Sequence, residues 1–189
     1  MSCPQTKQMI FPNALTRLLS EFKLRHATPD KQFSEAIRLW NAHDNAGAIK
    51  WGRRAARTLD LAKLALAQWL VHRRSDPQLN REALELLTLA AEGGLTEAQQ
   101  VLAIWYLDGI RVPKDPDKAF ELTKRAADAG NVNCQLQMVR FMTLGEYREP
   151  DIEAALHYAR LAAERGYPEV LEGLRRDLEN ERILGKTEK

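Results

Sequence analysis

The side chains most able to do chemistry in this sequence are four histidines, two cysteines and many carboxylates. The histidines, at 26, 43, 72 and 157, are scattered over different predicted helices, with no carboxylate or cysteine at the spacing of a metal-ligand set. No serine or cysteine lies in a nucleophile elbow or a cysteine-protease motif, and no glycine-rich phosphate-binding loop occurs. The carboxylates lie on amphipathic helices, where they are ordinarily solvated. The sequence therefore predicts no metal, no cofactor and no catalytic site, and we do not expect an enzyme.

One group of basic residues could bind an anion. Lys50, Arg53, Arg54 and Arg57 share one side of a predicted helix, and such a basic stripe could contact phosphate or an acidic partner. The chain nevertheless has a net charge of only +2 and lacks the interleaved aromatic residues and strongly basic balance of nucleic-acid-binding domains. We therefore expect no nucleic-acid partner and favour a solvated helix face for the basic stripe.

Export and membrane insertion are not indicated. No apolar run approaches the roughly 18 residues that are needed to cross a bilayer. The longest early apolar run, at residues 9–11, ends at Pro12 and is too short for a secretory signal. We expect no membrane partner and a cytoplasmic location.

A period of 36 residues organises the chain, and five kinds of position follow it over three copies. They are Ala62, Ala98 and Cys134; Trp69, Trp105 and Phe141; Ala83, Ala119 and Ala155; the alanine pairs 90/91, 126/127 and 162/163; and Gly94, Gly130 and Gly166. A fixed period between 20 and 50 residues is typical of a stacked repeat array. Because Cys134 stands where the other copies have alanine, we interpret it as a small core residue.

The middle copy, residues 98–133, predicts two helices. Apolar residues between 98 and 106 form the stripe of a half-buried helix, which Gly109 can end in a left-handed conformation. Asp115 can cap the second helix, and Pro116 suits its first position. This helix is expected to stop at Gly130. The small residues on one of its faces, which permit close packing, are Ala119, Ala126 and Ala127.

This unit resembles the Sel1-like repeat, a relative of the tetratricopeptide repeat. The residues that carry the resemblance are Ala98, Leu102, Ala103, Tyr106, Gly109, Val112-Pro113-Lys114-Asp115, Lys118-Ala119, Ala126-Ala127 and Gly130. The copy from Ala62 departs from the pattern at Leu70 and Arg73, and no Asp-Pro signal is expected in its loop; the copy from Cys134 departs at Met142 and Glu149. The resemblance covers about residues 62–166. It implies an all-α, right-handed α-α superhelix that binds other proteins and has no catalytic activity.

We expect one solenoid domain of about ten helices over residues 11–183. Its parts are a flexible N-terminus (1–10), an N-terminal cap helix (11–26), a divergent tetratricopeptide-like unit (30–59), three repeats (62–97, 98–133 and 134–167), a C-terminal cap helix (168–183) and a polar tail (184–189). The cap helix 11–26 carries an apolar stripe of Leu15, Leu18, Leu19 and Phe22. We expect this stripe to cover the open end of the array, although it could also bind a membrane or a partner. A loop is expected over residues 75–80, with the next helix starting near Arg81.

The first helices of the units are expected to line the concave side of the array. With Leu102 and Tyr106 facing inward, the binding positions are those that face away from the second helices. They are Leu64, Gln68 and His72; Gln100, Ile104, Leu107 and Asp108; and Leu136, Arg140 and Thr143. This mixed strip could bind a peptide or helix, with aliphatic anchors and orienting polar groups. Alternatively, the terminal helices could fill it from within.

The sequence therefore predicts a non-enzymatic interaction module, acting as a scaffold, an adaptor or a chaperone-like binder. Its partner is expected to be a peptide or helix segment of another protein, and a homo-oligomer remains open. An alternative is an inhibitor or immunity-type protein that occludes a partner enzyme.

Overall fold

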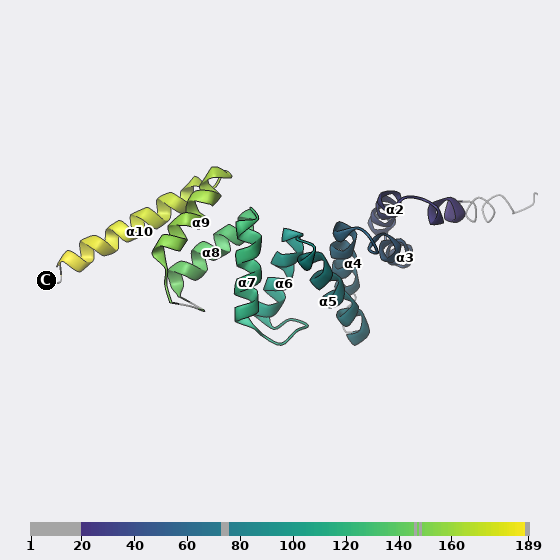
Figure 1. Ribbon diagram of the computed structural model, residues 1–189, viewed down its shortest axis with the longest axis horizontal. Helices are drawn as coiled ribbons and strands as arrows, with labels where there is room; N and C mark the ends of the chain where they lie inside the picture. Colours follow the sequence, from purple (N-terminus) through teal and green to yellow (C-terminus); the bar gives the residue numbers. More distant parts are fainter. Residues whose placement is uncertain (1–19, 73–75, 146, 148, 188–189) are drawn as a thin grey trace, which may run out of the picture.

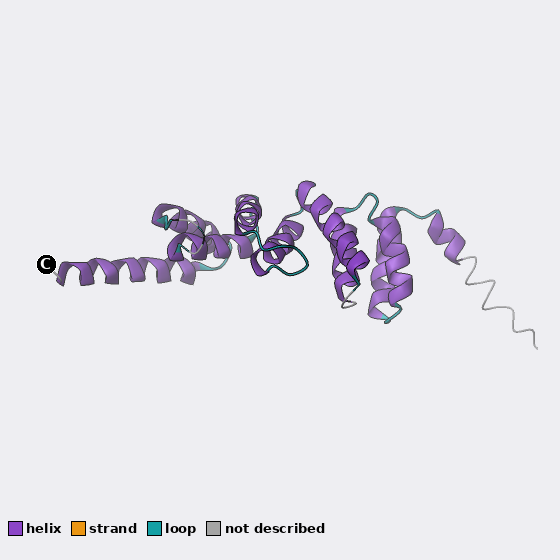
Figure 2. Cartoon of the chain, turned by 90° about the horizontal axis from the view of Figure 1, so that it is seen from below, coloured by secondary structure: helices purple, strands orange, loops and turns teal. Residues whose placement is uncertain are grey.

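The computed structural model describes residues 20–72, 76–145, 147 and 149–187, and within these residues every regular element is a helix (Figures 1 and 2). A helical segment over residues 20–25 comes first. The helices that follow are α2 (Pro29–Asn41), α3 (Asn45–Ala55), α4 (Asp60–His72), α5 (Pro77–Glu92), α6 (Thr96–Asp108), α7 (Pro116–Asp128), α8 (Val132–Leu144), α9 (Ile152–Glu164) and α10 (Pro168–Thr187). The prediction of an all-α array of about ten helices is confirmed.

The helices pack as antiparallel pairs in chain order. The pairs are α2–α3, α4–α5, α6–α7 and α8–α9, and we call the first member of each pair helix A and the second helix B. Each pair packs on the next through α3–α4, α5–α6 and α7–α8, and α10 packs on α9. Figure 1 shows the pairs following one another along the long axis of the molecule, with α10 leading away at the C-terminal end. Each unit thus makes its main contacts with its neighbours, as in a solenoid.

Capping residues fix where the helices begin. A side-chain oxygen accepts a hydrogen bond from a first-turn backbone N–H at Asp44, Asp76, Asp115, Asn131 and Asp151, which precede α3, α5, α7, α8 and α9. These bonds satisfy donors that have no partner inside the helix. At the other ends, Gly109 and Gly145 stop α6 and α8 with φ of 67° and 64°.

Helix α5 starts earlier than the sequence predicted. It begins at Pro77, so the expected helix start near Arg81 is wrong and residues 77–80 of the expected loop are helical. Asp76 caps the helix by accepting hydrogen bonds from the backbone N–H of Gln78 (2.8 Å) and Leu79 (3.4 Å). The Asp-Pro signal expected to be missing from this copy is therefore present. It lies three residues ahead of the place that the 36-residue register assigns to it.

We expect Asp76→Ala to lower the free energy of unfolding by about 1 kcal/mol, because two first-turn N–H groups lose their acceptor. Urea unfolding followed by circular dichroism measures this loss. Asp76→Asn is the matched control, since it keeps an acceptor oxygen and should lose little. Equal losses in the two variants would contradict capping as the cause.

Buried glutamines tie helices A to the helix that precedes them. Gln32, Gln99 and Gln135 occupy the fourth position of α2, α6 and α8, and each is almost fully buried. Each Nε2 donates to the carbonyl eight residues earlier: Leu24 (3.1 Å), Ala91 (2.9 Å) and Ala127 (3.1 Å). These carbonyls lie at helix ends, where no intrahelical donor remains. The segment 20–25 is therefore joined to α2 as α5 is joined to α6.

The core consists of two clusters of buried side chains. The first runs from α2 to the loop after α6 and includes Leu66, Trp69 and Leu102; the second runs from α7 to α10. Cys134 lies in the second cluster and is buried, as expected from its register position. Burial raises the pKa of the Cys134 thiol to about 11, so the thiol stays protonated at neutral pH.

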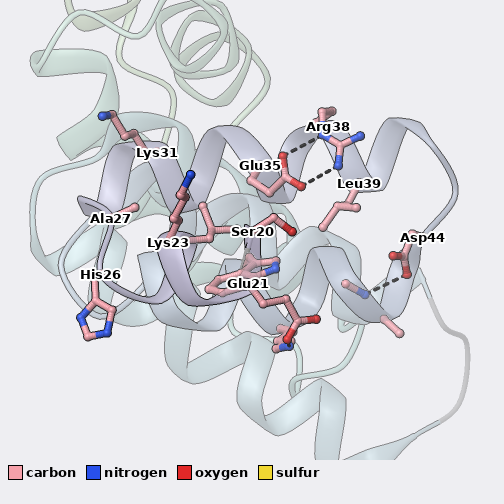
Figure 3. A pocket seen from close by; sticks show the side chains of 15 residues that line it. Ser20, Glu21, Lys23, His26, Ala27, Lys31, Glu35, Arg38, Leu39 and Asp44 are labelled. Carbon is pink, nitrogen blue, oxygen red and sulfur yellow. Dashed lines mark hydrogen bonds and ion pairs between the residues drawn. The ribbon is translucent and has the colours of Figure 1, made fainter. Parts of the chain in front are cut away.

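Two charged residues of α2 occupy positions that are apolar and packed against the preceding helix in α4. In α4, Leu66 and Trp69 pack against Gly52 of the preceding helix α3. The corresponding positions of α2 hold Glu35 and Arg38 instead, which form a bidentate ion pair of 2.7 and 2.6 Å (Figure 3). Hydrogen bonding to Arg38 lowers the pKa of Glu35, so the carboxylate stays ionised. This face of α2 is suited to solvent and not to a preceding apolar helix.

The sequence predicted that the apolar stripe of a cap helix covers this end of the array, and Phe22 is the one residue of that stripe that the structure describes. Residues 11–19, including Leu15, Leu18 and Leu19, lie outside the described part of the chain. Phe22 is 62% exposed, so it does not cover the array, and Leu24 packs on the first core cluster instead. The cap helix over residues 11–26 therefore stays a prediction.

Helix α10 takes the place of a further helix A. It begins 36 residues after α8, and Val170, Leu174 and Leu178 pack on the second core cluster. Arg175 is exposed, although its register position is buried in the four helices A before it. The residues there are Ala36, Ala67, Ala103 and Val139. A charge at this position suits a helix A that has no helix B of its own.

Helix α10 is also longer than expected. It continues to Thr187, so the predicted end at residue 183 is wrong and residues 184–187 of the predicted polar tail are helical; residues 188 and 189 lie outside the described part of the chain. Residues 174–184 contain no proline or glycine, which allows the helix to run past residue 183. The helix also continues through Gly185, which propensity does not explain.

Candidate functional site

Besides the second residue, the ninth residue of helix A is a register position that is exposed in all four pairs. It holds Ile37 of α2, Gln68 of α4, Ile104 of α6 and Arg140 of α8. Ile37 and Ile104 are 39% and 44% exposed. The residue immediately before each of the four is buried. We call these four residues the A-helix row.

The other expected binding residues lie at neighbouring positions of the helices A. Asp108 is exposed, whereas Leu64, Leu107 and Leu136 are half-buried. Leu64 packs on the first core cluster and Leu107 on the second, so these two contribute to the core and present only part of their surface. The backbone of His72 closes α4, but its side chain lies outside the described part of the structure.

Two polar side chains that were expected to bind a partner, Gln100 and Thr143, form hydrogen bonds within the array. The Oε1 atom of Gln100 accepts a hydrogen bond from Asn131 (3.2 Å), whose own Oδ1 caps α8. The hydroxyl of Thr143 donates to the carbonyl of Val139 (2.8 Å) in the preceding turn of the same helix. For a partner, Gln100 therefore offers its amide nitrogen more than its oxygen.

The sequence analysis missed Ile37 of α2 as a member of the A-helix row. Helix α2 begins only 31 residues before α4, whereas α4, α6 and α8 follow at intervals of 36. The shorter interval arises partly because the turn between α2 and α3 spans residues 42–44, compared with 109–115 in the second repeat. The signal that could have revealed it is Ala36, which matches Ala67 and Ala103 once the interval is shortened.

A cleft lies at the α2 end of the A-helix row. Its lining residues are Trp40, Asn41, His43, Asn45, Gln68 and Trp69. The indole of Trp40 stacks on that of Trp69, with ring centroids 5.1 Å apart and planes 15° apart. His43 has a φ of 62°, which residues other than glycine rarely adopt. We call this the tryptophan cleft.

The basic stripe is largely used to join helices of the chain. Lys50 pairs with Glu21 (3.1 Å), and Arg53 forms a bidentate pair with Glu82 of α5 (2.8 and 2.7 Å). Hydrogen bonding to Glu82 raises the pKa of Arg53. Arg54 donates to the carbonyl of residue 25 (3.3 Å), at the end of the segment 20–25. Three of the four stripe residues thus have internal partners, so the stripe also joins helices of the chain, which the expected solvated helix face did not include.

A second hollow lies between the segment 20–25, α2 and α3 (Figure 3). Its walls carry charges of both signs, including Lys23, Lys31 and Asp44 as well as the Glu35–Arg38 pair. Asp44 is engaged as the cap of α3. The mixture of signs favours neither an anion nor a cation.

The outer face carries a small hydrogen-bonded cluster between α7 and α9. Asp128 accepts a hydrogen bond from the hydroxyl of Tyr158 (2.8 Å) and pairs with Lys124 (2.7 Å). Burial and the bond to Asp128 raise the pKa of the Tyr158 hydroxyl well above its usual range. The cluster joins two helices B, so it stabilises the array.

Within the described residues, no three His, Cys, Asp or Glu side chains gather into a group that could hold a metal ion. None of the described helices is long and apolar enough to cross a membrane.

Helix pairs that stack in chain order, each on the next, define an α-solenoid. The chain belongs to the Sel1 repeat family: the model of that repeat matches residues 61–95, 96–131 and 142–167. The resemblance seen in the sequence is thereby confirmed. Sel1 repeat proteins generally mediate protein–protein interaction, and the repeat is a non-catalytic interaction fold.

Similar proteins occur in fungi and bacteria. Chitin synthase regulatory factor 4 of Schizosaccharomyces pombe is 38% identical over 100 residues, which are 52% of this chain and only 15% of that protein. A protective antigen of uropathogenic Escherichia coli with an SLR fold superposes with a TM-score of 0.65 at 23% identity, covering 81% of this chain and 34% of the other. A Sel1 repeat protein from Oxalobacter formigenes gives 0.64 at 22% identity, covering 78% and 61%. These two structural likenesses establish the shared fold.

Proposed function

We propose that this protein is a non-catalytic regulatory adaptor that binds a segment of another protein along the A-helix row. The observation that carries the proposal is the exposure of Ile37, Gln68, Ile104 and Arg140 at one register position, each next to a buried residue. A partner segment can contact such a row without disturbing the core. The regulatory role is supported by the name of the fungal relative, of which this chain matches only a small part.

The chemistry of the row suits a polypeptide partner. Ile37 and Ile104 offer apolar surface. Of the half-buried leucines, Leu107 lies about one turn after Ile104 in α6, and Leu136 lies on the next helix A, α8. Burial of these aliphatic groups supplies binding energy. Gln68 and Arg140 can orient the partner through hydrogen bonds, and Arg140 can pair with a carboxylate or a backbone carbonyl.

The test begins with capture of a partner by the full-length chain, followed by titration calorimetry of purified variants. We expect Ile104→Ala and Arg140→Ala each to weaken binding by more than about 1 kcal/mol, as truncation of real anchors does. Because the side chain of Ile104 is exposed, Ile104→Ala should change the melting temperature little.

Lys124→Ala is the control on the outer face, where Lys124 forms an exposed ion pair with Asp128. Its effect on binding should be negligible. Loss of binding in this variant, with no effect of the row variants, would contradict the proposed site. If the partner is an enzyme, its turnover with and without this protein separates an adaptor, which leaves the active site open, from an inhibitor.

A further inference from the structure

The tryptophan cleft has features that the packing of the array does not require. The position of Trp40 is occupied by Val71, Leu107 and Thr143 in the other helices A, so a stack of helix pairs can form with a small side chain there. In α2 the position carries an indole that stacks on Trp69 of the next helix A. The cleft beside this aromatic pair is therefore peculiar to the first unit.

His43 adds a second unusual feature. Its left-handed backbone conformation is one that glycine adopts without strain, as Gly109 and Gly145 do after α6 and α8. In the described part of the chain, Arg111 is the other non-glycine residue with positive φ, and it has a structural use. Its guanidinium lies 5.2 Å from the Trp105 ring centroid and donates to the Val71 carbonyl (3.5 Å).

The imidazole of His43 has no comparable use. It is exposed, and within the described residues no hydrogen bond, ion pair or ring contact engages it. The backbone of His43 does serve the fold, since its left-handed conformation ends α2 and its N–H donates to the carbonyl of Trp40 (3.0 Å), but glycine would do this without strain. An imidazole at this strained position on the rim of the cleft is therefore a reason to look for a ligand.

The lining of the cleft restricts what that ligand can be. None of its six residues carries a carboxylate, ammonium or guanidinium group, so strongly acidic or basic motifs gain nothing there. The rim instead offers hydrogen-bond donors from three carboxamides and the imidazole: Asn41, Asn45, Gln68 and His43. A ligand that presents hydrogen-bond acceptors can bind the N–H groups of this rim, and its apolar surface can contact the indole of Trp40, since Trp69 is only 8% exposed.

We propose that the tryptophan cleft binds a proline-rich segment of the partner in the polyproline II conformation. Such a segment has no internal hydrogen bonds, so its carbonyls are available to the rim donors, and its rings dock on aromatic-lined grooves. A helical segment fits less well, because its carbonyls are already bonded internally. Gln68 belongs to both the cleft and the A-helix row, so a chain seated in the cleft leads on towards Ile104, which favours a polypeptide over a carbohydrate.

The proposal rests on the proposed function, and its test uses a probe of its own. An octaproline peptide, blocked at both ends and fluorescently labelled, is titrated into the full-length protein and followed by anisotropy. We expect saturable binding of octaproline, no binding of a glycine–serine peptide of equal length, and no competition by cellohexaose. Competition by cellohexaose, or absence of octaproline binding, would overturn the proposal.

Substitutions of residues that line the tryptophan cleft test whether octaproline binds there. Gln68→Ala and His43→Gly should each weaken octaproline binding about fivefold or more. His43→Gly should do so with an unchanged or higher melting temperature, because glycine relieves the backbone strain. Trp40→Ala should abolish binding and Trp40→Phe should restore part of it; if Trp40→Ala does not fold, the other two variants decide. Full binding by both Gln68→Ala and His43→Gly overturns the proposal.

Ile104→Ala separates this inference from the proposed function, because Ile104 does not line the cleft. It should weaken the captured partner much more than it weakens octaproline. If octaproline fails to bind and the partner still depends on Ile104, the inference falls and the proposed function stands. If neither Ile104→Ala nor Arg140→Ala affects the partner, the proposed function falls.

Discussion

Trp105→Ala is expected to lower the free energy of unfolding by about 3–5 kcal/mol, the usual cost of removing a buried large aromatic side chain. Trp105 lies in the central repeat, is only 6% exposed and belongs to the first core cluster. The variant also removes the ring beneath the guanidinium of Arg111, which links the loop after α6 to this helix. Urea unfolding monitored by circular dichroism measures the loss.

Trp105→Phe is the matched control. Phe141 occupies the same register position of α8 and is buried there, so a phenyl ring is compatible with this site of the repeat. We expect the phenylalanine variant to lose clearly less stability than the alanine variant. Equal losses would mean that the six-membered ring contributes no packing and that the indole N–H or pyrrole part alone matters.

Ala127→Leu is expected to lower the free energy of unfolding by about 1–3 kcal/mol, because additional methylenes would be forced into a close-packed contact. Ala127 has no exposed surface and belongs to the second core cluster. Its carbonyl accepts the hydrogen bond from the buried Gln135 of α8, so displacing α7 would also strain that bond. Thermal and urea unfolding both report the change.

Ala163→Leu is the control for this substitution. Ala163 occupies the same register position in α9 but is half-buried, so a larger side chain has room to turn towards solvent. We expect a distinctly smaller loss there. An unchanged melting temperature for Ala127→Leu would show that α7 does not pack closely at this position.

Local features of the fold could be predicted from the sequence because they depend on residues close together in the chain. Asp115 and Pro116 start α7, and Gly109 ends α6, through bonds and dihedral angles within one helix turn. The 36-residue register identified the alanines that lie in tight contacts. It also placed Ile104 and Arg140 at equivalent positions, which are exposed in the structure.

Contacts between units could be assigned only from the tertiary structure. Arg53 and Glu82 are 29 residues apart, and neither residue type indicates that they pair. The use of Gln100 by Asn131 and the exposure of Phe22 are likewise decided by which side chains the packing brings within reach. A polar side chain on a helix surface has many candidate partners, and sequence periodicity does not choose among them.

The sequence by itself determined the all-helical class, the caps of the second repeat and the 36-residue repeat, because hydrophobic period and capping chemistry act locally. The cap of α5 at Asp76 and the end of α10 were missed. The tertiary structure decided where the row of exposed residues begins. The 31-residue interval before α4 hid the equivalence of Ile37 with Gln68 and Ile104, and the packing established it by placing Ala36 at the buried position of Ala67 and Ala103. The stacking of Trp40 on Trp69 also depends on how α2 lies beside α4, because the two indoles come from these successive helices A.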